Sequence, residues 1–200
     1  PTIHSNDSLF YTINMRRPMK GGGGIQPDIK TEIEKAPAFI NALWKKGVFL
    51  SFAAQYKISK DMDNSDIEIT DKIFNEFEDF YNDIKGDVTY KLPGEKDFDN
   101  MKLKIQNQSD NADFLSIFQR RNNAQRYLDR MEKYFKIEKS RQFQNEVNKK
   151  WLINGLEKEF SRVLISEKER IGVSLKVDNE YDEAIAILLN KDLYNSILGY

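Results

Sequence analysis

Proline and glycine, which interrupt regular backbone structure, are concentrated at the start of this sequence. Four of the 5 prolines lie within the first 37 residues, and four of the 10 glycines are consecutive, from Gly21 to Gly24. No proline follows Pro93. Because both residues are unfavourable inside helices, we expect strands and turns over about the first 35 residues and mainly helix in the rest of the chain.

The first segment carries too little regular structure to fold alone. Residues 9–13 (LFYTI) are mostly aromatic, β-branched or apolar and predict a strand, and residues 25–29 (IQPDI) predict a short extended segment. The glycine run would then form a tight turn. Because an isolated pair of strands is at best marginally stable, we interpret residues 1–33 as the trailing β segment of a larger domain.

From Pro37 onward, apolar residues recur at the three- and four-residue spacing of helices. Gly47 marks a break after the first apolar stripe, and Thr70 and Asp178 are suited to cap two later helices. Residues 88–92 alternate in polarity and fit either a brief strand or an extended linker. The expected apolar faces are Phe39, Ile40, Leu43 and Trp44; Phe49, Phe52, Ala53 and Tyr56; Ile73, Phe77, Phe80, Tyr81 and Ile84; Phe98, Met101 and Ile105; Phe114, Ile117, Phe118, Leu128, Met131 and Phe135; Phe143, Val147, Trp151, Phe160, Val163 and Leu164; and Ala184, Ile185, Leu188 and Leu189.

These stripes predict a mainly α fold. About five to seven helices joined by short connections are typical of a bundle-like domain. We expect that domain to occupy residues 34–200, with a short β-hairpin or strand segment before it.

Composition excludes several kinds of chemistry. The sequence has no cysteine, so it forms no disulfide, thiolate zinc site or cysteine nucleophile, and its single histidine, His4, excludes sites that need two. Lys+Arg 31 and Asp+Glu 32 leave a net charge of −1, and no apolar run reaches the ~18 residues of a membrane span. We expect no nucleic-acid partner and no membrane span in this segment. The chain begins with Pro1 rather than methionine, which we interpret as the mark of a fragment.

Two loops resemble ligand sites only superficially. Glycine-rich loops can bind phosphate through backbone amides, but they require a following helix and a Lys-Ser/Thr pair, whereas Ile25–Asp28 follows this one. Residues 61–66 alternate oxygen ligands as calcium loops do. Their sixth position is Asp66 instead of glycine, however, and the twelfth is Lys72 instead of glutamate. We therefore expect no cofactor and no metal site.

Other polar or aromatic groupings have simple structural explanations. A basic face comprises Arg120, Arg121, Arg126, Arg130, Lys133 and Lys136. Asp129 and Glu132 are interleaved with it, as on a solvated helix with i,i+4 pairs. His4 lies near Ser5 and Ser8, but a serine–histidine site is not expected so close to a chain end. The aromatic stripes favour a hydrophobic core over a ligand-binding groove.

One motif resembles a known family. Phe10-Tyr11-Thr12, then Arg17, then residues 21–29 (GGGGIQPDI) resemble a signature of the bacterial carboxyl-terminal processing (tail-specific) serine peptidases. Residues 43–47 and 52–56 are similar to the C-terminal extension of one envelope-associated branch, and residues 181–194 to its closing helix and tail. Arg16 stands where the family usually has glycine. The signature residues, to which the resemblance assigns a structural role, are Phe10, Thr12, Arg17, Gly21, Gly22, Gly23, Gly24, Pro27 and Asp28.

The resemblance implies a Ser–Lys dyad, in which a desolvated lysine takes the proton of the serine nucleophile. Family order places both residues upstream of the signature, and therefore upstream of Pro1, so we expect no catalytic residue in this chain. Residues 1–33 would complete the catalytic domain. Residues 34–200 would cover that core, guide protein or peptide substrates, or mediate self-association. The implied location is the periplasm or cell envelope.

An alternative from another functional class is a stand-alone helical module that binds a partner helix or peptide through its aromatic faces, without protease activity. A third and weaker alternative is a calcium-controlled helical protein.

Overall fold

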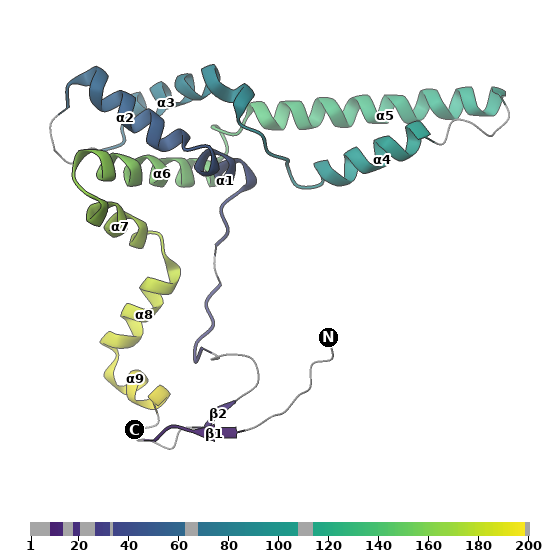
Figure 1. The fold of residues 1–200 in the computed structure, drawn as a ribbon. Helices are drawn as coiled ribbons and strands as arrows, with labels where there is room; N and C mark the ends of the chain where they lie inside the picture. The colour runs from purple at the N-terminus through teal and green to yellow at the C-terminus, as the bar shows by residue number, and fades with distance from the viewer. Residues whose placement is uncertain are drawn as a thin grey trace. The chain divides into compact units, whose positions relative to one another are not determined.

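The computed structural model describes residues 9–13, 18–20, 27–32, 34–62, 68–107 and 114–198, with the side chains of 9, 20, 106–107 and 114–122 left undescribed. The described part is mainly helical, which confirms the predicted fold class. Its elements (Figure 1) are β1 (Leu9–Tyr11), β2 (Pro18–Lys20), α1 (Ala38–Lys45), α2 (Val48–Lys60), α3 (Asp71–Ile84), the 3₁₀ turn η1 (Lys85–Asp87), α4 (Glu95–Asn107), α5 (Phe114–Ser140), α6 (Glu146–Leu164), α7 (Glu167–Leu175), α8 (Asn179–Leu189) and α9 (Lys191–Leu198).

The chain divides into two compact units. One consists of residues 36–174, which we call the helical body, and the other combines residues 1–35 with residues 175–200, which we call the terminal unit. The predicted boundary between residues 33 and 34 stays a prediction.

A short antiparallel hairpin forms in the terminal unit, as predicted, but its second strand is not the extended segment expected after the glycine run. β1 pairs with β2 in antiparallel register, with Phe10 opposite Met19. The expected partner of the first strand was residues 25–29, of which the described part, 27–29, contains no strand. Pairing with residues 18–20 closes a shorter loop and costs less conformational entropy. β2 begins with Pro18 and ends with Lys20, and because both residues are rare in strands the sequence pattern does not predict a strand there.

A large aromatic core holds the helical body together. It is formed by buried side chains of α1, α2, α3 and α6, with Val88 and Phe143 added from the connecting segments. Phe49 lies at its centre, fully buried, with its ring centroid 4.6 Å from that of Trp44 and 5.3 Å from that of Phe77. The aromatic stripes are therefore core, as predicted.

Local signals set the helix boundaries. The Thr70 hydroxyl accepts a hydrogen bond from the Ile73 amide, and the Asp178 carboxylate accepts two from the amides of Glu180 and Tyr181. These contacts confirm both predicted N-caps, because such side chains satisfy amides that lack an intrahelical partner. Gly47 separates α1 from α2 with a φ of 66°, a conformation that favours glycine.

A second, smaller core joins α4 to α5, which run side by side in Figure 1. Phe98 of α4 packs against Leu128 and Phe135 of α5. Ion pairs flank this contact, with Lys102 bound to Glu132 and Lys139 Nζ 2.6 Å from a carboxylate oxygen of Glu95.

Several details of the predicted helices are wrong. The nine α-helices of the described part exceed the expected number, because the short helices α7 and α9 carry too few apolar repeats to be recognised. Residues 88–92 form no strand, which agrees with the other alternative, an extended linker. Phe143 was expected on the face of α6 but lies in the turn before that helix. Val147, expected on an apolar face, is 56 % exposed. Six other residues expected on apolar faces are also exposed: Met101, Met131, Ala184, Ile185, Leu188 and Leu189.

Candidate functional site

The residues of the glycine-rich signature are only partly described. Phe10 lies in β1 and is 61 % exposed, and Thr12 directly follows that strand. Pro27 and Asp28 lie in the segment without regular structure that leads toward α1. The structural role that the resemblance assigns to them stays a prediction. The other signature residues, Arg17, Gly21, Gly22, Gly23 and Gly24, lie outside the described residues, as does Arg16.

Two other candidate sites also fall largely outside the described part. His4, Ser5 and Ser8 are among the undescribed residues, as are positions 63–66 of the calcium-like loop. The first residue of that loop, Asp61, is described and ends α2 in a left-handed conformation. Among the residues that the structure describes, no group of His, Cys, Asp or Glu side chains could hold a metal ion.

The basic face of α5 is solvent-exposed where its side chains are described, at Arg126, Arg130, Lys133 and Lys136. The interleaved acid Glu132 binds Lys102 of α4, and Asp129 accepts a hydrogen bond from Gln125. At least one of these acids therefore stabilises the contact between the two helices. The side chains of Arg120 and Arg121 lie outside the described set.

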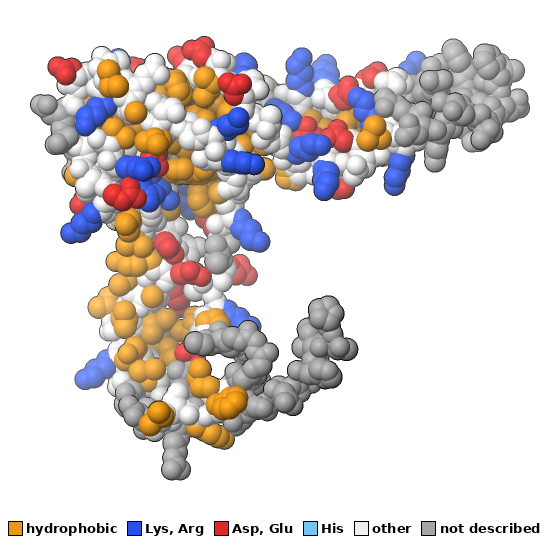
Figure 2. All heavy atoms as spheres, viewed as in Figure 1, with side chains coloured by type: hydrophobic (Ala, Val, Ile, Leu, Met, Phe, Trp, Pro, Cys, Tyr) orange, Lys and Arg blue, Asp and Glu red, His pale blue; other side chains and the backbone are white. Residues whose placement is uncertain are grey.

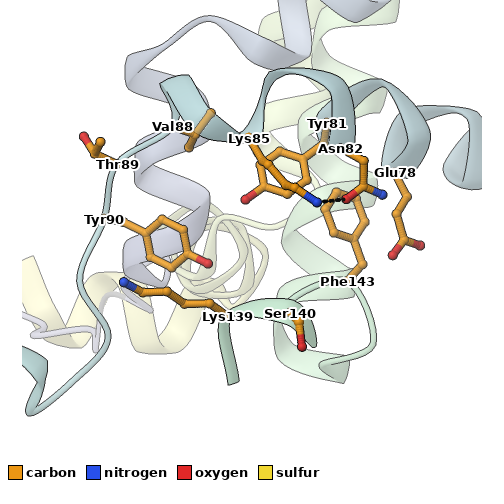
Figure 3. A pocket seen from close by; sticks show the side chains of 10 residues that line it. All are labelled: Glu78, Tyr81, Asn82, Lys85, Val88, Thr89, Tyr90, Lys139, Ser140 and Phe143. Atoms are coloured by element: carbon orange, nitrogen blue, oxygen red, sulfur yellow. Dashed lines mark hydrogen bonds between the residues drawn. The ribbon is translucent and has the colours of Figure 1, made fainter. Parts of the chain in front are cut away.

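A pocket of about 440 Å³ opens where the end of α3, the segment after it and the end of α5 meet (Figure 3). Its wall combines aromatic rings with hydroxyl, amide and charged groups. The lining residues are Glu78, Tyr81, Asn82, Lys85, Val88, Thr89, Tyr90, Lys139, Ser140 and Phe143. Within the described residues, no helix has the length and apolar composition that a membrane span requires.

Two tyrosines that line this pocket have raised pKa values. Burial raises the pKa of Tyr90, and the nearby Tyr81 hydroxyl and Glu95 carboxylate raise it further. Burial also raises the pKa of Tyr81. Within the described part, the hydroxyl oxygen of Tyr90 is buried without a hydrogen bond of good geometry. Lys139 Nζ lies 5.4 Å from the centre of the Tyr90 ring, a cation–π distance.

We expect this pair to make stability depend on alkaline pH. A tyrosine whose pKa is raised by folding keeps its proton in the folded state and loses it in the unfolded state above about pH 10. The contribution of these tyrosines to the free energy of unfolding is therefore fully present below about pH 10, and it is lost as the pH rises toward the folded-state pKa. A titration of tyrosinate absorbance should show a late phase, and Tyr90→Phe should reduce both this phase and the alkaline loss of stability. Tyr127→Phe, at an exposed site, is the control. An unchanged late phase in Tyr90→Phe would contradict this assignment.

Lys139 and Ser140 line the same pocket but do not form a catalytic dyad. The Ser140 hydroxyl donates a 2.7 Å hydrogen bond to the Ile137 carbonyl, as at many helix ends. Lys139 Nζ lies 2.6 Å from the Glu95 carboxylate, so its amine is directed at that carboxylate and not at the serine. A general base must be directed at the serine hydroxyl, so this arrangement supplies no activated nucleophile at Ser140.

A second hollow, of about 320 Å³, lies between the end of α5 and the start of α6. Its wall includes Pro37, Pro93, Tyr134 and Val147, the last two of which are more than half exposed. Tyr127, Met131 and Tyr134 are spaced i, i+4, i+7 and share one exposed face of α5. They extend the apolar wall of this hollow along the helix. We call the combined surface the α5 groove.

Sequence reasoning missed most of the residues in both hollows. Gln142 and Asn148 are buried, and Asn148 Nδ2 donates 3.0 Å hydrogen bonds to the backbone carbonyl and the side-chain oxygen of Gln142. These two polar residues are assigned to no face by the apolar spacing. Buried polar residues that hydrogen-bond to each other and to the nearby backbone give no periodic signal in a single sequence.

The comparison with protein families covers the helices just described. Residues 39–188 match the family model described as "Probable PDZ-protease, C-terminal helical domain". The chain belongs to this family. The match runs from the first turn of α1 almost to the end of α8, three quarters of the sequence, and confirms the predicted kinship with the C-terminal region of a processing peptidase. No curated protein and no solved structure matches the chain significantly.

The family match relates the helical fold to proteolysis. The helical domain is a protease-related domain, and protein substrates are the class that the family suggests. The matched region is, by its description, a C-terminal helical domain.

Proposed function

We propose that this chain is the non-catalytic C-terminal part of a serine endopeptidase that processes or degrades proteins from or near their C-termini. The observation that carries the proposal is the family match over residues 39–188, which directly follows the glycine-rich peptidase signature. Residues 1–33 then complete the catalytic domain. The Ser–Lys dyad lies upstream of that segment, and the enzyme acts in the periplasm or cell envelope.

Within this enzyme, the helical body guides substrate through the α5 groove. Exposed aromatic and aliphatic side chains beside two prolines offer shallow apolar contacts, which suit an extended polypeptide better than a compact ligand. Arg130 lies between Tyr127 and Tyr134 on the same helix face and adds a positive charge at the edge of the groove.

The groove predicts a kinetic effect on the full-length enzyme. The double substitution Tyr134→Ser with Val147→Ser should raise KM for an unstructured protein substrate roughly tenfold, corresponding to a loss of about 1.4 kcal/mol of binding, with kcat nearly unchanged. Initial-rate measurements over a range of substrate concentrations separate the two constants. Ile58→Ser, which alters an exposed residue of α2, is the control. A fall in kcat at constant KM would argue against substrate guiding.

The proposal has a direct sequence test. Translating the gene region that precedes residue 1 should reveal a serine and a lysine in the contexts that the peptidase family uses. Their absence would exclude a Ser–Lys enzyme. Fractionating cells and probing for the protein tests the proposed envelope location, and recovery with cytoplasmic markers would contradict it.

One observation favours a second candidate, the stand-alone binding module. The helical body has its own closed aromatic core, so it contains what a self-sufficient domain needs. Under this alternative, residues 36–174 bind a partner helix or peptide without proteolysis. An upstream sequence without the dyad would favour it.

A further inference from the structure

The described residues of the terminal unit form no core of their own. No described residue of segments 1–35 and 175–200 is buried. Large apolar side chains nevertheless gather along α8 and α9, as Figure 2 shows, and Leu189 is 82 % exposed. The exposed apolar residues of these two helices are Tyr181, Ile185, Leu188, Leu189, Leu193 and Tyr194.

Both helices are nevertheless well specified by local signals. Asp178 caps α8, and the Asn190 side-chain oxygen accepts a 3.1 Å hydrogen bond from the Leu193 amide at the start of α9. Short helices are marginal in water unless an apolar face is packed. Helices this short with exposed apolar faces therefore require a body that covers those faces.

The β1–β2 hairpin needs the same kind of support. Its strands expose Phe10 and Tyr11, and Ile13 just after β1 is almost fully exposed. Two strands do not form a stable sheet without further strands or a packed face. The segment that follows the hairpin contacts α8, because the Thr31 hydroxyl donates a 3.2 Å hydrogen bond to a carboxylate oxygen of Glu180.

We propose that α8 and α9 dock on the catalytic domain that residues 1–33 complete. This inference rests on the proposed function. Contacts place α8 and α9 in the same compact unit as the N-terminal segment. A catalytic domain that extends the β1–β2 sheet would therefore lie next to both helices. The charge of the two helices indicates what the facing surface of the catalytic domain is like. Because α8 and α9 carry four carboxylates and one lysine around their apolar faces, a complementary surface is apolar with basic groups at its rim.

Docking would give the helical domain two attachments to the peptidase. The helical body is joined to the catalytic domain through the chain that enters at Ala36, and through α8 and α9, which follow the end of the body at Ser174. A domain held by both chain ends has less orientational freedom than one held by a single linker. The C-terminal helices thus act as a clasp that fixes the position of the accessory domain.

Hydrogen exchange in the natural full-length protein tests the clasp. Backbone amides of residues 184–194 should exchange at least tenfold more slowly there than in the isolated 200-residue chain, with no dependence on protein concentration. The double substitution Ile185→Asp with Leu188→Asp should restore fast exchange. Ile171→Asp, which places the same charge on an exposed residue of α7, should not.

The outcomes separate this inference from the proposed function. Equally fast exchange in both proteins, in a full-length chain that carries the Ser–Lys dyad, would overturn the clasp and leave the peptidase assignment intact. Protection that grows with protein concentration would assign the surface to a second copy and would also overturn it. If the upstream sequence lacks the dyad, the proposed function fails first and the clasp with it.

Discussion

Replacing Phe49 by alanine should lower the free energy of unfolding by about 3–5 kcal/mol, the largest effect that we expect of any single substitution. The Phe49 ring is fully buried between the rings of Trp44 and Phe77, and the space that it leaves cannot collapse without moving α6. Urea unfolding followed by circular dichroism measures the change. Tryptophan fluorescence, which comes from Trp44 and Trp151, offers an independent probe of the same core.

The neighbouring residue supplies the control for this prediction. Leu50 lies next to Phe49 in α2 but is 37 % exposed, so Leu50→Ala should cost about 1 kcal/mol or less. Equal losses for the two variants would mean that Phe49 is not central to the core.

Gly155→Ala should destabilise the protein by about 1–2 kcal/mol, whereas the same change at Gly172 should stabilise it by about 0.5–1 kcal/mol. A Cβ at residue 155 would lie 2.7 Å from a Phe49 ring carbon, well inside van der Waals contact. That ring is fixed by its neighbours and cannot move aside. A Cβ at Gly172 would meet nothing within 4 Å, so the variant gains only helix propensity.

A double variant tests the cause of the Gly155 effect. Phe49→Leu removes the ring atoms that the new Cβ would contact, so Gly155→Ala should cost less in that background than in the natural sequence. Thermal or urea unfolding of all four proteins gives the coupling energy. Strictly additive changes would show that the contact between α2 and α6 is not the reason glycine is needed at 155.

Much of the helical body could be predicted from the sequence, because its signals are local. Apolar spacing places the faces of α1, α2 and α3, and capping side chains such as Thr70 mark helix starts. The sequence could not reveal that Gly155 allows α6 to approach Phe49, since that requirement arises from packing between helices far apart in the chain. The pairing of β1 with β2 was missed for a different reason, because Pro18 and Lys20 are poor strand formers.

The candidate site was less accessible to prediction. The pocket of Tyr81 and Tyr90 joins residues from three segments, and none of them forms a motif. The exposed face of α8 was predicted as a core face, because apolar spacing indicates that a helix face is buried but not what buries it. The family resemblance supplied the missing context, since the glycine-rich signature and the helical match lie on one chain.

The central claim is that this chain is the helical, non-catalytic part of a peptidase. Its most direct test is a cleavage assay on an unstructured protein, with the natural full-length protein and the 200-residue chain measured side by side. We expect the full-length protein to cleave the substrate and the 200-residue chain to leave it intact. Cleavage by the 200-residue chain that a serine-directed inhibitor abolishes, or no cleavage by the full-length protein, would contradict the claim.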